Sequence, residues 1–119
     1  TIVVRGTLNV KGGTITSAST DNSTISIEST GIVSITGGTI SNTGKFRAIV
    51  DSGKLTINGS SVIIQSNGNS TSRRNATVVI NAGASDNFQF KAGTIRNTST
   101  GYCYYNEDKD KDKKGTWTK

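Results

Sequence analysis

Two stretches of the sequence decide the fold: Gly31–Asp51 reads GIVSITGGTISNTGKFRAIVD, and Asp86–Asn106 reads DNFQFKAGTIRNTSTGYCYYN. The two align without a gap at an offset of 55 residues, and both contain Gly-Thr-Ile followed by Asn-Thr. The segment Gly6–Thr16, GTLNVKGGTIT, matches the start of the first stretch 25 residues earlier. A weaker copy begins at Gly53, and the last five residues, GTWTK from Gly115, look like the beginning of one more. Such self-similarity is the signature of a repeat architecture.

The copies begin at Gly6, Gly31, Gly53, Asp86 and Gly115, so their spacings are 25, 22, 33 and 29 residues. A constant pattern at unequal spacing indicates a fixed strand framework with loops of different length. We therefore predict an all-β fold, a right-handed parallel β-helix (β-solenoid) of about four coils with three short strands each. The main rival is a β-sandwich, which has frequent turns but no such self-similarity.

Each copy is interpreted as three strands in which alternate side chains point inward. The expected strands are Thr7–Val10, Thr14–Thr16 and Thr24–Glu28; Ile32–Ile35, Thr39–Ser41 and Lys45–Val50; Lys54–Ile57, Ser61–Ser66 and Thr77–Ala82; and Asn87–Phe90, Thr94–Asn97 and Tyr102–Asn106. The register of the third strands in the second and fourth coils stays open. Residues 2–5 are expected to be the last strand of a preceding coil.

Four ladders of inward side chains follow from this alignment. They are Leu8, Val33, Leu55, Phe88 and Trp117; Val10, Ile35, Ile57 and Phe90; Ile15, Ile40, Val62 and Ile95; and, on the third strands, Ile25, Ile27, Ala48, Val78, Ile80 and Cys103. The Gly pairs 12–13 and 37–38 separate first from second strands, where a sharp corner needs the positive φ that Gly adopts freely. Asn42 and Asn97 end second strands, where Asn tolerates the left-handed conformation.

The composition restricts the chemistry. Only 31% of the residues are hydrophobic, but Ile and Val dominate them, and these strand formers argue against disorder. The absence of His excludes Ser-His-Asp and Cys-His catalysis and His-ligated metals, and the single Cys103 excludes an internal disulfide or a Cys-cluster zinc site. No cofactor is expected. Because the chain also lacks Met, we expect residues 1–119 to be a single segment of a longer protein.

The net charge is +6, which permits attraction to anionic partners. The charges are scattered, however, and the densest run, residues 107–114, alternates in sign and nearly cancels. We therefore expect no nucleic-acid partner. No apolar run approaches the length of a membrane span, so membrane insertion is not expected either.

The string G-x-h-x-h-x-G-G-T-I (h, hydrophobic), followed by N-T and then AIVD or YCYYN, resembles β-helix repeats of bacterial surface and secreted proteins. It is most similar to repeats of large adhesin-like proteins of gut Firmicutes, over Gly6 to Lys119. The resemblance implies an extracellular or cell-surface location and a non-enzymatic structural or adhesive role, with carbohydrate or a host surface protein as partner. The same coil pattern resembles pectate-lyase-like enzymes and phage tail fibres. A polysaccharide lyase or hydrolase fragment and a tail-fibre segment therefore stay open as alternatives.

Three acidic residues, Asp108, Asp110 and Asp112, alternate as at the start of a calcium loop. Such a loop needs Gly at its sixth position and Glu at its twelfth, where this sequence has Lys113 and Lys119. The alignment favours a solvated loop inserted between coils, so these residues are only weak metal candidates.

Five residues are candidates for ligand binding. Arg73 and Arg74 lie in the longest insertion, and paired Arg side chains can bind carboxylates or phosphates, although they also suit an ordinary polar loop. Tyr102, Tyr104 and Tyr105 could stack on sugar rings, although alternation must turn one or two of them inward.

Both ends of the stack are expected to be open, because no capping helix is visible and residues 2–5 and 115–119 look like cut strands. Open strand edges invite pairing. The sequence therefore predicts contact with neighbouring coils of the parent chain, or end-to-end self-association.

Overall fold

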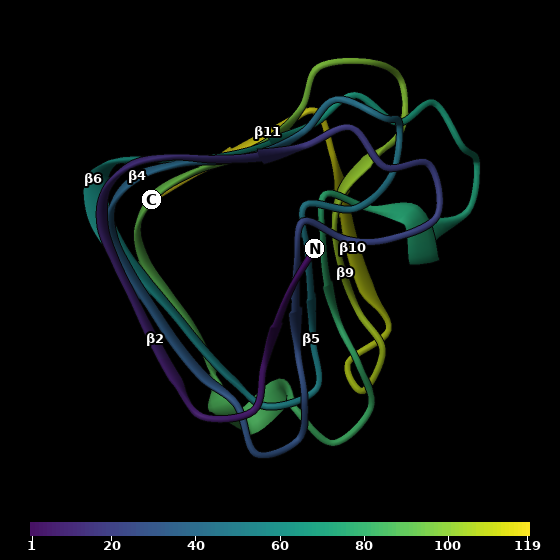
Figure 1. The fold of residues 1–119 in the computed structure, drawn as a ribbon. Helices are drawn as coiled ribbons and strands as arrows, with labels where there is room; N and C mark the ends of the chain where they lie inside the picture. The colour runs from purple at the N-terminus through teal and green to yellow at the C-terminus, as the bar shows by residue number, and fades with distance from the viewer.

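The computed structural model describes residues 1–119 and stacks the repeats as about four coils of a β-solenoid with a triangular outline (Figure 1). From β1, which lies in front in this view, the chain runs clockwise as it recedes, so the solenoid is right-handed. The predicted fold class is confirmed. The strands are β1 (Ile2–Val4), β2 (Thr7–Ser17), β3 (Ile25–Ile27), β4 (Ile32–Asn42), β5 (Ile49–Asp51), β6 (Lys54–Ser66), β7 (Val78–Ile80), β8 (Phe88–Asn97), β9 (Tyr102–Asn106), β10 (Lys111–Lys114) and β11 (Thr116–Thr118). Two 3-10 turns, η1 (Arg73–Asn75) and η2 (Ser85–Asn87), complete the fold.

The strands form two sheets, which cover the three sides of the triangle. One sheet has the order β1-β3-β5-β7-β9-β10, and the other has the order β11-β8-β6-β4-β2. The expected first and second strands of each coil are one long strand that bends at the glycine corner, where the pairing of β2 with β4 shifts register. Gly13 and Gly38 have φ values of 77° and 90° at this bend, as the sharp corner requires.

The two ladders on the first side are as predicted from Leu8 to Phe88 and from Val10 to Phe90. The second-side ladder differs in the third coil, where Ile64 and not Val62 pairs with Ile40 and Ile95. The cause is a longer corner in β6, with five residues between Ile57 and Ile63 against three between Ile35 and Thr39. Val62 is still fully buried, in the corner itself.

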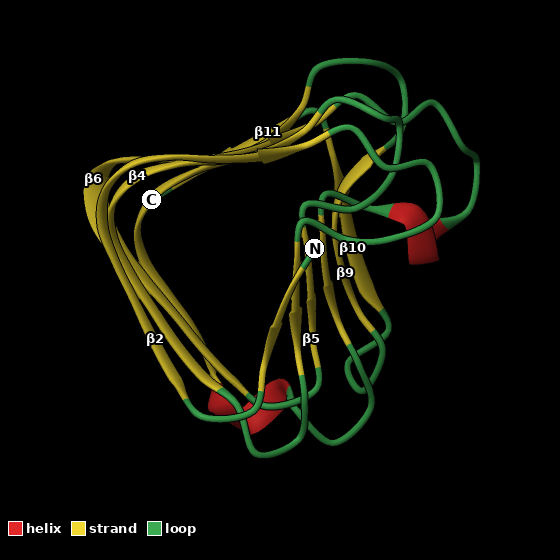
Figure 2. Cartoon of the chain, in the orientation of Figure 1, coloured by secondary structure: helices red, strands yellow, loops and turns green.

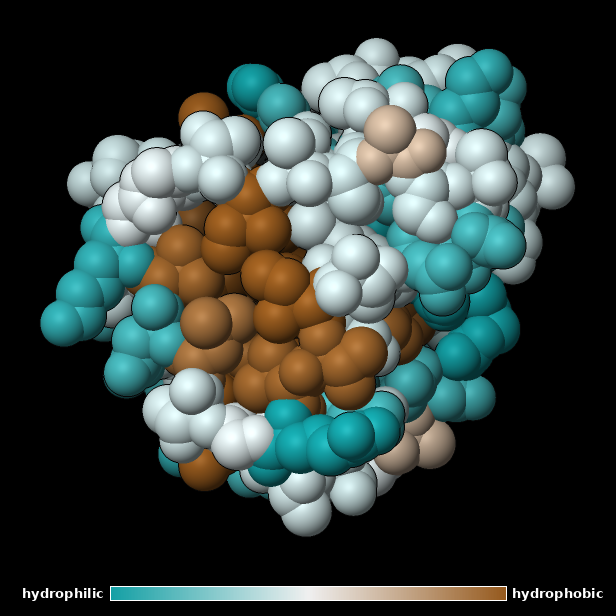
Figure 3. Space-filling model, in the orientation of Figure 1, coloured by the Kyte–Doolittle hydropathy of each residue, from teal (hydrophilic) through white to brown (hydrophobic).

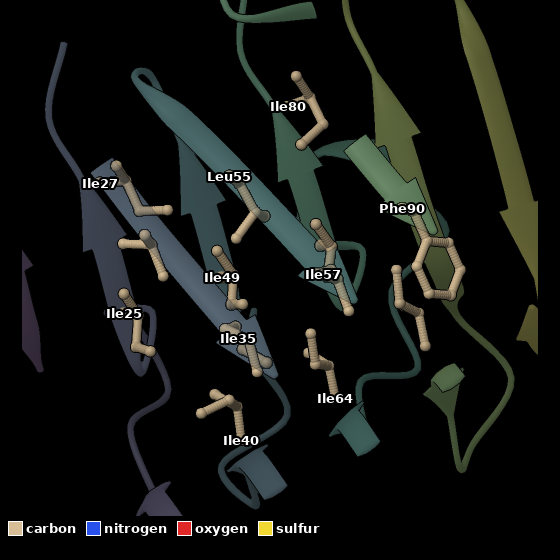
Figure 4. Packing of buried hydrophobic residues seen from close by; sticks show 14 of the residues in the cluster. Ile25, Ile27, Ile35, Ile40, Ile49, Leu55, Ile57, Ile64, Ile80 and Phe90 are labelled. Carbon is tan, nitrogen blue, oxygen red and sulfur yellow. The ribbon is translucent and has the colours of Figure 1, made fainter. Parts of the chain in front are cut away.

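The third side resolves the register that the sequence left open. Each strand of this side places two side chains inward, and equivalent side chains of successive coils form a ladder whose members we call rungs. The first ladder consists of Ile25, Ile49, Val78 and Tyr104, and the second consists of Ile27, Asp51, Ile80 and Asn106. Ala48 and Cys103 are buried as expected, but they lie one residue before the rung, where the chain enters the strand. Figure 4 shows the labelled isoleucines, Leu55 and Phe90 gathered between the strands.

The C-terminal end of the stack contradicts the sequence prediction. Residues 115–119 do not begin a further coil, because β10 runs antiparallel to β9 and β11 runs antiparallel to β8. Positive φ angles at Asp110 (51°) and Gly115 (74°) reverse the chain. Trp117 pairs with Ile95, and its ring packs 4.8 Å from Phe90 and 4.6 Å from Tyr104 between centroids. This end of the core is therefore covered, and residues 106–115 contribute a strand to the sheet and do not form only a loop.

Candidate functional site

The loops that follow the four long strands emerge together at one corner of the triangle (Figure 2). We call this surface, formed by residues 18–24, 43–48, 67–77 and 98–101, the loop corner. The long strands end in register there, with Ser17, Asn42, Ser66 and Asn97 in one column. Parallel stacking therefore brings loops that are distant in the sequence onto one surface.

Side chains in this column hold the loops in place through hydrogen bonds. Asn42 Nδ2 donates to the carbonyl oxygens of Asn22 (3.2 Å) and Arg47 (3.0 Å), and Asn97 Nδ2 donates to those of Gly68 (2.9 Å) and Tyr102 (3.1 Å). In the other two coils Ser17 and Ser66 form hydroxyl pairs with Thr24 and Thr77, each at 2.7 Å. The expectation of a left-handed conformation at Asn42 and Asn97 is wrong, since neither has a positive φ. These amides serve instead to join adjacent loops.

Arg47 joins the loops of three coils. Its Nε donates to Ser23 Oγ (3.2 Å), its Nη1 donates to the carbonyl of Arg74 (3.3 Å), and its guanidinium lies 4.4 Å from the ring centroid of Phe46. Burial, and to a lesser extent the charge of Arg74, lowers the pKa of Arg47. Sequence reasoning did not select Arg47 or Phe46, because their neighbours lie in other coils.

Arg73 and Arg74 lie at the edge of the loop corner, over the outer face of the third side. Their guanidinium carbons are 4.6 and 5.9 Å from the ring centroid of Tyr105. Arg73 Nη1 donates to Asp110 Oδ1 (2.7 Å) and Asp112 Oδ2 (3.2 Å), and these bonds raise the pKa of Arg73. The structure thus brings together residues that the sequence presented as separate candidates.

Two further side chains extend this cluster. Arg74 Nη1 lies 3.3 Å from Glu107 Oε1, and its Nη2 donates to Asn81 Oδ1 at 2.9 Å. Beneath the arginines, Tyr105 continues the outward column of Val50 and Val79 and is only 8% exposed. The cluster therefore fastens the loop of η1 onto β9 and β10.

The tyrosines divide between the two faces of β9. Tyr104 points into the core, is 6% exposed and stacks on Phe88 with centroids 5.7 Å apart, so its prediction as a ligand-binding residue is wrong. Burial raises its pKa. Tyr102 faces outward and is half-buried, with Lys114 Nζ 4.8 Å from its ring centroid. Of the three rings, only Tyr102 keeps substantial exposure.

Each of the three candidate metal ligands binds a donor of the protein itself. Asp108 Oδ2 accepts the Gly83 N–H at 2.9 Å, while Asp110 and Asp112 both bind Arg73. No group of three or more His, Cys, Asp or Glu side chains lies together as a metal site requires.

Asp51 is the one buried carboxylate, and sequence reasoning did not select it. It lies in the column between Ile27 and Ile80, its Oδ1 accepts the Gly53 N–H at 2.9 Å, and its Oδ2 has no partner. Burial raises its pKa to about 6, against the opposing effect of the Gly53 bond. The sequence signal for a special role of Asp51 is its alignment with Asn106, because both polar residues stand where β3 and β7 have an inward isoleucine.

The molecule has no pocket, and its only helical segments, η1 and η2, are far too short to span a membrane. Cys103 is buried, which raises the pKa of its thiol to about 11. No protein-family model matches the chain, and no curated protein or solved structure matches it either.

Proposed function

We propose that the chain is a structural and adhesive segment, without catalytic activity, of an extracellular or cell-surface bacterial protein. The loop corner is the surface it presents to carbohydrate or to a host surface protein. One observation carries the proposal: loops from four successive coils are held side by side by hydrogen bonds between coils. The resemblance of the repeats to those of bacterial surface proteins supports the same assignment.

The hydrogen bonds between coils preorganise the loops. Loops on a rigid scaffold commonly carry binding residues, and fixing them before binding lowers the conformational entropy lost on association. Asn67 illustrates this order, because its Oδ1 accepts the Lys45 N–H (2.8 Å) while its Nδ2 donates to the carbonyl of Thr43 (3.1 Å). The corner is rich in Ser, Thr and Asn, whose hydroxyl and amide groups match the hydroxyl groups of sugars.

Binding to a glycan array and to immobilised host surface proteins tests the proposal. Lys45→Gly removes an exposed charge at a residue whose φ of 68° suits glycine, and Phe46→Ser removes the ring beneath Arg47. We expect each to weaken binding at least several-fold. The control Lys54→Ala changes an exposed lysine on the first side and should bind like the parent chain.

Two results would count against the proposal. The first is retention of binding by both loop-corner variants, or the absence of any bound glycan or protein. The second is release of new reducing ends or unsaturated products from a bound polysaccharide, which would instead assign the lyase or hydrolase alternative.

A further inference from the structure

The N-terminal end of the stack differs from the covered C-terminal end. Figure 3 looks onto this end and shows apolar side chains in the middle of the triangle with hydrophilic ones at its rim. β2 pairs with β4 along one edge, and the other edge of its eleven residues has no strand partner. Leu8 and Ile15 are only half-buried and Ile2 is 38% exposed, whereas Val33 and Ile40 in the next coil are fully buried.

The inner coils show why glycine recurs in this repeat. A Cβ at Gly31 would collide with the carbonyl oxygen of Val4, and a Cβ at Gly37 would collide with that of Lys11. The same holds one coil later at Gly53, against the carbonyl oxygens of Glu28 and of Gly31, which directly precedes the long strand β4. Each of these glycines therefore admits the backbone of the coil before it.

Gly6 and Gly12 hold the equivalent positions in the first coil, yet nothing lies within 4 Å of a Cβ built on either. Neither has a positive φ, unlike Gly13 at 77°. The sequence thus keeps two glycines at places where the conformation does not need them and no neighbour crowds them. A further backbone layer over this end would account for both.

We infer that this end is the docking surface of a further coil of the same polypeptide, whose long strand runs parallel to β2 with its backbone over Gly6 and Gly12. Residues 1–6, TIVVRG, align with residues 48–53, AIVDSG, and Ile2 lies in the rung of Ile25 and Ile49. β1 therefore already occupies the third side of that coil. The long strand of the coil would cover Leu8 and Ile15. The inference rests on the stack and is independent of the function proposed for the loop corner.

The test adds the proposed coil to the N-terminal end of the stack. A copy of residues 31–47 is fused directly before Thr1, so that Thr1 takes the place of Ala48 and the copied long strand lies over β2. Thermal unfolding is followed by far-UV circular dichroism for the 119-residue chain and for the extended chain, each with and without Gly12→Ala.

We expect the extended chain to melt at a higher temperature than the 119-residue chain. Gly12→Ala should leave the melting midpoint of the 119-residue chain unchanged or slightly raised. In the folded chain no atom lies close to the new Cβ, and in the unfolded chain the substitution lowers the conformational entropy. In the extended chain it should lower the midpoint by several degrees, because the new backbone then meets its Cβ. The matched control Gly37→Ala should lower both midpoints.

Two outcomes overturn the inference. One is an extended chain that is no more stable, or one in which Gly12→Ala is still tolerated. The other is a 119-residue chain that sediments as a dimer and becomes monomeric with Gly12→Ala, which would make a second copy the occupant of this end.

Discussion

At the scale of single residues, Asp51 makes the stability of the protein depend on pH. Its carboxyl replaces an apolar rung between Ile27 and Ile80, and one of its oxygens has no partner. A carboxyl whose pKa is raised from 3.8 to about 6 on folding binds its proton more tightly in the folded chain. Its contribution to stability is therefore greatest below about pH 4, decreases up to about pH 6 and is constant above that.

The variant Asp51→Asn isolates this contribution, because it keeps an oxygen that accepts the Gly53 N–H but cannot ionise. Relative to this variant, the parent chain should lose on the order of 2 kcal/mol of unfolding free energy between pH 4 and pH 7. Urea denaturation at several pH values measures the difference. Asp86→Asn, at an exposed position, should follow the parent chain. Equal pH profiles for Asp51→Asn and the parent chain would contradict the prediction.

At the scale of elements, β10 and β11 form the cover of the C-terminal end. Trp117 is the side chain through which β11 contacts the core, since its ring packs on both Phe90 and Tyr104. Lys113 and Lys119 place their ammonium groups 5.1 and 5.7 Å from the same ring. The contacts of this one side chain with two aromatic rings therefore add to the strand pairing that holds the cover.

Trp117→Ala should reduce the unfolding free energy by about 2 kcal/mol, less than for a fully buried aromatic residue because Trp117 is only half-buried. Trp117→Phe keeps an apolar ring and should lose less than half of that amount. Urea denaturation followed by far-UV circular dichroism measures both. If the alanine variant is as stable as the parent chain, β11 does not cover the core in solution.

These elements also show how far the sequence could predict the structure. The ladders of Leu8 and Val10 follow from period-2 alternation and the glycine corner, because both features are local. The segment GTWTK correctly predicted a strand, but its direction depends on reversals at Asp110 and Gly115 that a likeness to GTLNV cannot show. In SSVIIQS the same alternate set contains both Val62 and Ile64, and only the length of the corner decides that Ile64 pairs with Ile40 and Ile95.

The candidate site was less accessible from sequence than the fold. Arg73 contacts Tyr105 and Asp110, which are more than thirty residues away in the sequence. Arg47 contacts Ser23, which lies in the preceding coil. The sequence identified Arg73 and Tyr105 by residue type alone. Their contacts depend on the path of each loop and on the register between coils. Neither can be deduced from a sequence whose repeats differ in length.

At the scale of the whole molecule, each coil packs only on the coils next to it, as in other solenoids. Stability is then the sum of local terms and decreases toward layers with fewer neighbours. Amide hydrogen exchange should therefore be slowest in strands that are paired on both edges, such as β4 and β6, and fastest in the edge strands β1, β2, β10 and β11. Mass spectrometry of exchanging peptides measures this order. Uniform protection along the chain would indicate a single cooperative unit instead.

The position of the aromatic side chains has an optical consequence. The only tryptophan lies in β11, and all three tyrosines lie in β9. The fluorescence of tryptophan and tyrosine therefore reports on the last coil alone, while far-ultraviolet circular dichroism reports on every coil. The chain thus carries a built-in spectroscopic label at one end, and a difference between the two signals during unfolding would show which end of the stack opens first.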